Sequence, residues 1–145
     1  MLLKWIGTFV LTIVLTAFSA VSASASTNTL SIGSPITLTD RVLVTIPMTI
    51  VCDPVDSPFS SFIDFSLKQA DGQSVSTASG EIFSSPPALI CDGVTQNTTP
   101  LNLTPNAGSG PFHGGGAILA VSFHYCSFSF CETGSFGPAP VQLRG

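Results

Sequence analysis

Apolar and polar side chains alternate along several stretches of the chain, which is the pattern of a β-strand that buries one face. The longest such stretch covers residues 41–52, where Val42 and every second residue after it is apolar. Pro47 stands in its middle, and because proline lacks an amide donor, we expect an edge, a bulge or a break there. The same alternation predicts strands over 61–69 and 117–126.

Turn signals separate the predicted strands. The sequence Ala-Asp-Gly-Gln at 70–73 predicts a tight turn, so the stretch 73–83 should return antiparallel to 61–69. The glycine-rich stretch 106–116 is expected to be a loop. About seven or eight short strands without a helical period predict an all-β fold, an antiparallel β-sandwich. The remaining strands are expected near 30–38, 99–104 and 140–144.

The first 25 residues have the pattern of a secretory signal peptide. Lys4 precedes an uncharged, largely apolar stretch at 5–21, and Ala23-Ser24-Ala25 has the form that a signal peptidase cleaves. The alternative is an uncleaved anchor, but a spanning helix needs ~20 apolar residues, and threonine and serine interrupt this stretch. We expect a signal-peptide helix at 1–25 and one domain at 26–145, secreted or held at the cell surface, without a membrane span.

The small number of charged residues, and of basic ones above all, excludes one class of function. The 145-residue chain is 44% hydrophobic and 8% charged, whereas an ordinary globular domain is about 25% charged. Beyond residue 25, three basic side chains (Arg41, Lys68 and Arg144) stand against eight acidic ones. So few cations cannot neutralise a phosphate backbone, which excludes a nucleic-acid binder. The acidic balance favours solubility after export.

All four cysteines, Cys52, Cys91, Cys126 and Cys131, lie beyond the signal segment. An even number of cysteines in an exported chain indicates disulfides, and four cysteines allow three pairings. A tight hairpin or loop can bridge Cys126 and Cys131, which leaves Cys52–Cys91 as a long bridge that would cross between the two sheets. A zinc site is not expected, because no C-x-x-C pair occurs and the two histidines lack ligand spacing.

The segment 121–130, with the sequence VSFHYCSFSF, is the feature that points most strongly to a partner. It has no formally charged side chain and contains four large rings: Phe123, Tyr125, Phe128 and Phe130. One buried strand face cannot hold all four unless the Cys126–Cys131 loop folds back. Two interpretations stay open. The rings pack onto the core, or they form an exposed patch for an extracellular protein or glycan, or for edge-to-edge assembly.

Candidates for chemistry are few. His113 or His124 with a serine and an acid would suit a hydrolase, yet neither G-x-S-x-G nor S-x-x-K occurs. Asp53 and Asp56 lie in a loop that offers oxygens to calcium, but two carboxylates fall short of the roughly six to eight ligands that calcium takes. We therefore expect no catalytic residue, no metal and no cofactor.

The order of several short motifs resembles a known group of proteins. These motifs are "IVC" at 50–52, "FSLKQADGQ" at 65–73, "ICDG" at 90–93, "GPFHGGGAILAVSF" at 110–123, the paired Cys126 and Cys131, and "VQLRG" at 141–145. Over 30–145 the chain resembles small secreted bacterial proteins, commonest in actinobacteria, that are predicted to be immunoglobulin-like β-sandwiches of unknown function. This resemblance implies an immunoglobulin-like fold and carries over no catalytic residue.

A fainter likeness links the chain to the neocarzinostatin-type apoproteins. Those are also exported, acidic and immunoglobulin-like, and one of their two disulfides encloses the same short spacing as Cys126 and Cys131. Their other bridge spans a short loop, whereas Cys52 and Cys91 lie far apart. The sequence therefore favours a secreted, non-catalytic immunoglobulin-like module with a binding or cell-surface structural role. A small-molecule, chromophore-type carrier is the alternative, and a small secreted hydrolase ranks third.

Overall fold

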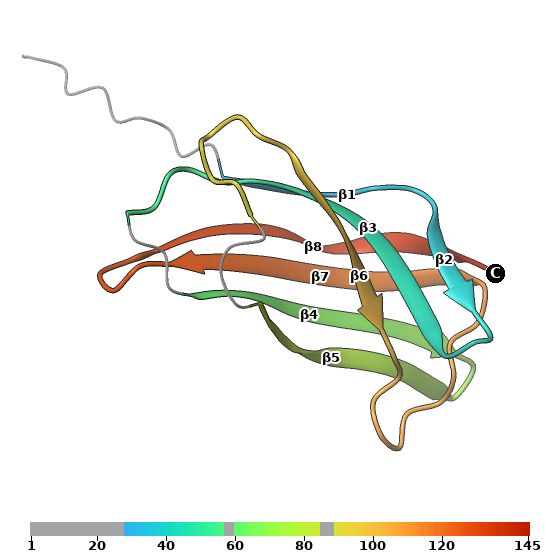
Figure 1. Cartoon of the computed structure of the whole chain (residues 1–145). Helices are drawn as coiled ribbons and strands as arrows, with labels where there is room; N and C mark the ends of the chain where they lie inside the picture. Colours follow the sequence, from blue (N-terminus) through green and yellow to red (C-terminus); the bar gives the residue numbers. More distant parts are fainter. Residues whose placement is uncertain (1–27, 57–59, 85–88) are drawn as a thin grey trace, which may run out of the picture.

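The computed structural model describes residues 28–56, 60–84 and 89–145, so the expected signal segment at 1–25 lies outside the described residues. The described residues form an all-β structure without a helix, as the alternation of side chains predicts, and accordingly they hold no helix able to span a membrane. Their strands (Figure 1) are β1 Thr29–Ile32, β2 Ile36–Thr39, β3 Leu43–Val51, β4 Ser60–Asp71, β5 Ser74–Ser84, β6 Asn97–Leu103, β7 Gly115–Cys126 and β8 Cys131–Arg144.

Two strands differ from the sequence prediction in extent. The expected strand at 30–38 is divided into β1 and β2, with a break between Ile32 and Ile36. β8 is far longer than the predicted 140–144, because it begins at Cys131. Its first half contains Gly134 and Gly137 and so lacks the alternation that marks a strand. Pairing with β7 along almost its whole length makes this stretch extended.

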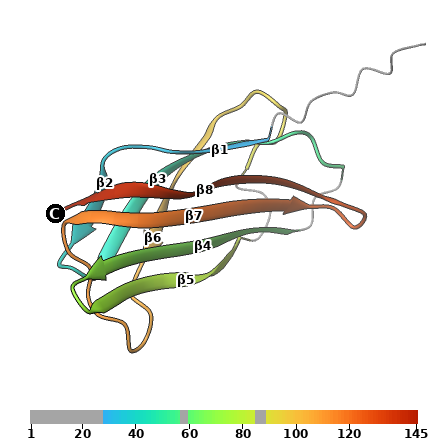
Figure 2. The ribbon, with the colours of Figure 1, turned by 180° about the vertical axis from the view of Figure 1, so that it is seen from behind.

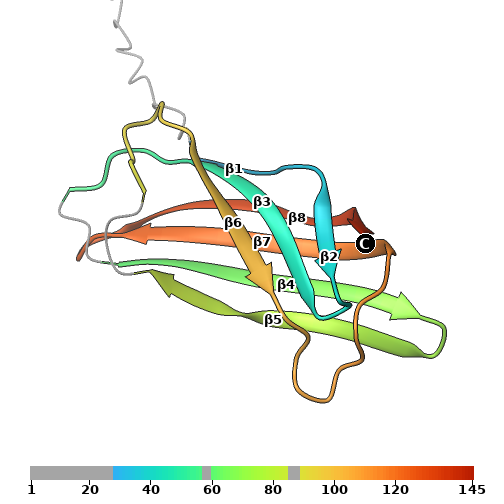
Figure 3. The same cartoon turned by 45° about the vertical axis from the view of Figure 1, so that its right-hand side comes forward.

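All strands belong to one open, hydrogen-bonded sheet in the order β1-β3-β2-β8-β7-β4-β5, with β6 paired to β3. Among the described residues, every strand pairing is antiparallel except β2–β8, which is parallel and joins two groups of strands. We call β1, β2, β3 and β6 the front layer, and β4, β5, β7 and β8 the back layer. Figure 1 and Figure 3 show β3 and β6 crossing in front of β7 and β4, and Figure 2 shows the back layer from behind.

Inward side chains from both layers meet in one hydrophobic core. Every second residue of β3 from Val44 onward is buried, and so is every second residue of β7 from Ala117 onward. This confirms the period-two pattern read from the sequence. Val42 departs from it and is exposed, because it precedes β3 and follows the turn at Asp40 and Arg41, whose φ angles are 51° and 61°.

The edge, bulge or break expected at Pro47 is not found, because β3 is continuous through Pro47 and pairs with β6 on one side and with β1 and β2 on the other. The Gly33 amide donates to the Pro47 carbonyl at 2.8 Å, so the missing donor of Pro47 faces the gap between β1 and β2. On the other side of β3, Pro47 pairs with Pro100 of β6. The missing donor of Pro100 therefore faces away from β3, toward the unpaired edge of β6, where a proline hinders edge-to-edge association.

Both expected disulfides are present. Cys126–Cys131 closes the turn between β7 and β8, and Cys52–Cys91 joins the end of β3 to the segment that leads into β6. Because β6 pairs with β3, the long bridge ties neighbouring segments. We expected from the sequence that this bridge would cross between the two layers. That expectation was wrong, because both cysteines belong to segments of the front layer.

Candidate binding site

The structure divides the four rings of the aromatic segment into two pairs. Phe123 and Tyr125 lie on the inward face of β7 and are buried. Phe128 and Phe130 lie in the turn between β7 and β8, where their exposed fractions are 89% and 47%. The four-ring patch is therefore corrected to two residues, because strand alternation directs Phe123 and Tyr125 into the core while the chain reverses before Phe128.

The turn that carries Phe128 and Phe130 is held by covalent and hydrogen bonds. The Ser127 amide donates to the Phe130 carbonyl at 2.8 Å, and the Ser127 hydroxyl accepts from the amides of Ser129 and Phe130, both at 3.3 Å. The Cys126–Cys131 disulfide closes the same turn at its base. Backbone freedom is thus restricted around two exposed rings.

This turn lies at one end of the molecule, together with the segment after β3 and the segment before β6 (Figure 1). We call this the hairpin end. Its acidic side chains are Asp53, Asp56, Asp92 and Glu132. The basic side chains of the described residues lie at the opposite end: Arg41 precedes β3, Lys68 pairs with Ile118, and Arg144 pairs with Thr37. The exposed rings therefore stand in an acidic field.

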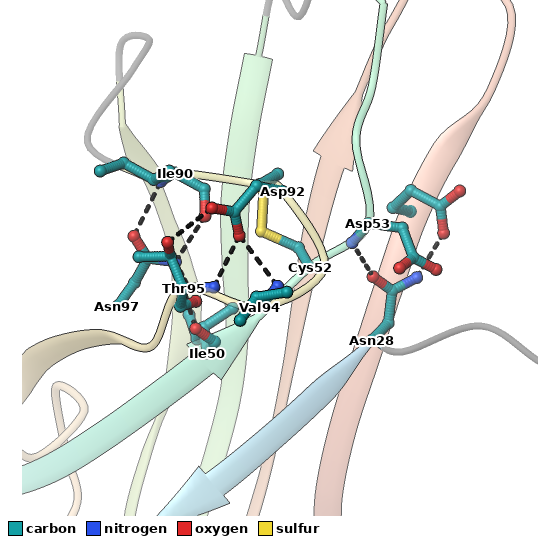
Figure 4. The surroundings of a disulfide bond; sticks show 11 residues. Asn28, Ile50, Cys52, Asp53, Ile90, Asp92, Val94, Thr95 and Asn97 are labelled. Carbon is teal, nitrogen blue, oxygen red and sulfur yellow. Dashed lines mark hydrogen bonds between the residues drawn. A yellow bond between two sulfur atoms is a disulfide. The ribbon is translucent and has the colours of Figure 1, made fainter.

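Side-chain hydrogen bonds also hold the segment before β6 (Figure 4). The Asp92 carboxylate accepts from the Thr95 hydroxyl and amide, both at 2.6 Å, and from the Val94 amide at 2.9 Å. These bonds, the Thr95 hydroxyl first, lower the pKa of Asp92 to about 2. The Asn97 side chain accepts from the Ile90 amide at 2.7 Å and donates to the Ile90 carbonyl at 2.9 Å. Ile90 and Val94 are left exposed on an ordered loop.

Asn28 links the hairpin end to the first strand. Its side-chain oxygen accepts from the Asp53 amide at 2.8 Å, and its side-chain nitrogen donates to the carboxylate of Glu132 (Figure 4). Glu132 follows Cys131 at the start of β8, so one amide side chain connects the segment after β3 with the disulfide-closed turn. Asn28 therefore ties Asp53 and Glu132 together at the hairpin end, which also carries the exposed rings.

The two histidines lie at opposite ends of β7 and each faces one carboxylate. His124 Nε2 lies 3.2 Å from Asp64 Oδ2, and the His124 ring stacks on Phe62 with 4.4 Å between ring centroids, on the outer side of the back layer. His113 Nδ1 lies 3.9 Å from Asp71 Oδ2 just before β7 begins. The structure does not bring the two imidazoles together. Across the described ranges, no group of three or more His, Cys, Asp or Glu side chains could hold a metal.

A cavity of about 440 Å³ opens between the two layers, beside β6 on one side and β4 and β5 on the other. Met48, Leu101 and Phe123 form its buried base. Its other lining residues are Ser61, Phe62, Ile63, Ile82, Leu89, Asn97, Thr98, Thr99, Pro100 and His124. The volume lies within the range of about 300–1,000 Å³ that is typical of small-molecule sites.

We did not predict this cavity from the sequence. We also missed two buried side chains, Gln69 and Phe112, that close the core at the end opposite the hairpin end. Gln69 is completely buried; its amide nitrogen donates to the His113 carbonyl at 2.8 Å, and its oxygen accepts from the His113 amide at 2.9 Å. Phe112, also completely buried, donates its amide to the Arg41 carbonyl at 2.9 Å. The burial of Gln69 could have been predicted from the sequence, because Gln69 continues the alternating inward positions of β4 after Leu67.

Comparisons with protein-family models, with curated proteins and with solved structures give no match to this chain. The two resemblances drawn from sequence motifs therefore stay predictions.

Proposed function

We propose that the chain is an exported, non-catalytic binding module with an immunoglobulin-like β-sandwich fold. Support for the fold comes from two layers of antiparallel strands that share one core, and from connections grouped at the two ends of the strands (Figure 1). Support for export comes from the signal pattern at 1–25 and from the pairing of all four cysteines. The domain then extends from residue 26 to residue 145.

The observation that carries the binding role is the exposure of Phe128 and Phe130 on a closed turn. Large apolar rings in water are unfavourable for a monomer, and such groups mark interaction sites when they cluster. Aromatic side chains also dominate the energetics of interfaces. Because the disulfide and the Ser127 hydrogen bonds already fix the turn, a partner loses little conformational entropy on binding it.

The surroundings of the turn favour an extracellular protein as the partner. Asp53, Asp56, Asp92 and Glu132 share the hairpin end, and no basic side chain of the described residues lies there. A complementary surface presents an apolar pocket for the rings with basic groups around it, which speeds association and excludes acidic surfaces. A neutral glycan that stacks on the rings is the second class of partner, distinguished by its insensitivity to salt.

Affinity capture with matched variants tests this proposal. The wild-type chain, Phe128→Ser/Phe130→Ser and the control Val42→Ser/Val75→Ser would each be immobilised and exposed to the secreted and surface proteins of the organism that makes the chain. Val42 and Val75 are also exposed but lie at the opposite end of the molecule. We expect the wild type and the control to retain the same saturable partner, and the double phenylalanine variant to lose it while both disulfides stay formed. A folded Phe128→Ser/Phe130→Ser variant that retains every partner contradicts the proposal.

A further inference from the structure

We propose that the cavity between the layers is a binding site for one small, uncharged and largely apolar molecule. This inference goes beyond the partner proposed for the hairpin end, and it rests on different residues. Such a site needs apolar walls, a space that the fold maintains, and polar groups that disfavour a charged ligand.

The walls of the cavity are apolar where they are deepest. Met48 and Leu101 reach its base from the front layer and Phe123 from the back layer, and all three are almost completely buried. Ile63 and Ile82 face each other across β4 and β5 and continue the apolar wall outward. Ile82 has an exposed fraction of 39%, so it lies at the mouth. An apolar molecule that enters removes this surface from water, which favours binding.

The packing of Phe123 explains why the space is present. Phe123 pairs with Ile63 of β4 on one side and with Gly134 of β8 on the other. A Cβ atom placed on Gly134 would overlap the Phe123 ring, so the ring extends over β8. The volume next to Ile63 is left unfilled. The resulting space of about 440 Å³ opens to the surface beside Ile82 and is large enough for a small molecule.

The polar groups around the cavity select an uncharged ligand. None of the described residues that line it is an Asp, Glu, Lys or Arg. Its one ionisable side chain, His124, has its Nε2 directed to Asp64 on the outer side of the layer. A buried charge without a partner is costly, so a charged ligand is disfavoured.

The Thr99 hydroxyl is available to orient the ligand. Thr99 lies on the inward face of β6, opposite Met48, and its hydroxyl makes no hydrogen bond to any described residue. The amide of Asn97, by contrast, is committed to Ile90 and to the Ile50 carbonyl. A ligand with a single carbonyl, ether or hydroxyl group next to an apolar ring or chain therefore fits the site best.

Dye binding to the full chain tests the site with a matched pair of probes. N-phenylnaphthylamine is uncharged and apolar, and anilinonaphthalenesulfonate has the same rings with an added sulfonate. We expect the uncharged dye to bind saturably with one-to-one stoichiometry, and the sulfonated dye to bind at least about tenfold more weakly. Equal binding of both dyes would overturn the proposal, because it would indicate a non-selective apolar surface.

Two residue-specific readings locate the dye. Met1 and Met48 are the only methionines of the chain, so methyl labelling of methionine gives Met48 its own NMR signal at the base of the cavity. We expect N-phenylnaphthylamine to shift this signal with the same saturation curve as the fluorescence. Binding that leaves the Met48 signal unchanged overturns the proposal without any variant, and it would place the dye elsewhere, for example on the apolar segment 5–21.

A blocking variant with a matched control completes the test. Ile82→Trp enlarges a side chain at the mouth, and Val75→Trp makes the same kind of change at an exposed position of the same strand, away from the cavity. We expect Ile82→Trp to weaken binding of the uncharged dye at least about tenfold through steric overlap, and Val75→Trp to leave it unchanged. Equal affinities in the two variants overturn the proposal.

Discussion

Phe123 on β7 lies opposite Gly134 on β8, and its ring occupies the space that a side chain at Gly134 would need. The sequence does not mark this relationship, because the stretch of β8 around Gly134 lacks the alternation of a strand. It determines where the core is filled and where it is open. The ring covers β8, and the space beside Ile63 stays available for a ligand.

Gly134→Ala should therefore destabilise the fold and reduce the cavity. The added Cβ forces the Phe123 ring to move toward Ile63, and overpacking of this kind costs about 1–3 kcal/mol. Chemical denaturation measures the free energy of unfolding, and dye titration measures the loss of affinity. The control is Gly114→Ala, where the nearest atom to the new Cβ is the Leu143 carbonyl oxygen at 3.8 Å. If Gly134→Ala is as stable as Gly114→Ala, the packing argument for the cavity is wrong.

The two disulfides should contribute unequally to stability. Cys52–Cys91 has a sequence separation of 39 and Cys126–Cys131 one of 5. On the loop-entropy model, replacing both cysteines by serine costs about 4 kcal/mol for the long bridge and about 2 kcal/mol for the short one. Denaturant unfolding checks this order.

We also expect Cys126→Ser/Cys131→Ser to weaken partner binding, because the turn that holds Phe128 loses its closure. An unchanged affinity would contradict this role for the disulfide.

Acidification should weaken the loop around Asp92. Its pKa is lowered from 3.8 to about 2, so the folded state favours the ionised carboxylate. A group whose folded pKa is depressed contributes stability above its unfolded pKa and loses it as the pH falls through the folded pKa. The contribution of Asp92 is therefore complete above pH 3.8 and disappears as the pH falls toward 2. As the pH falls across this range, the free energy of unfolding should therefore decrease less in Asp92→Asn than in the wild type.

The Thr95 hydroxyl is the largest cause of this shift. Thr95→Val should raise the pKa of Asp92 toward 3.8, as followed by NMR titration of the carboxyl carbon. Thr98→Val changes a nearby exposed threonine that has no bond to Asp92 and serves as the control. A pKa that is the same in both variants would show that the backbone amides alone hold the carboxylate.

Gln69→Leu should destabilise the far end of the core. The Gln69 amide satisfies both the amide and the carbonyl of His113, and its nitrogen also lies 3.3 Å from the Gly116 carbonyl oxygen. Leaving buried polar groups without partners costs about 1–3 kcal/mol. Gln73→Leu, in an exposed turn, should change the free energy of unfolding little. Similar unfolding curves for the two variants would show that water replaces the lost bonds.

The sequence predicts the strands that bury one face, and the reason is physical. Val44 through Ile50 and Ala117 through Tyr125 follow a period of two because alternate positions face water and core. The first half of β8 has no such pattern, and only its pairing with β7 makes it extended. The break between β1 and β2 contains Gly33 and Pro35 and lies beside Pro47 of β3, which lacks an amide donor there.

The candidate sites could be predicted only in part. Composition singles out the segment 121–130, but it does not separate Phe123 from Phe128, because that separation depends on where the chain turns. The cavity depends on which side chains of β3, β4, β5, β6 and β7 face one another. No local pattern records that arrangement. Thr99 and Ile82, for instance, look like ordinary strand residues in the sequence.

Site-specific photo-crosslinking at the exposed turn tests the binding role most directly. A photoreactive phenylalanine analogue would be placed at Phe128 in the chain produced by its own organism, and at Val75 as the control at the other end. Both positions are exposed, with fractions of 89% and 54%. We predict one saturable crosslinked protein at position 128 that excess wild-type chain competes away, and no such product at position 75. The absence of a competed product at 128, or the same products at both positions, would contradict the proposal that this turn is the binding surface.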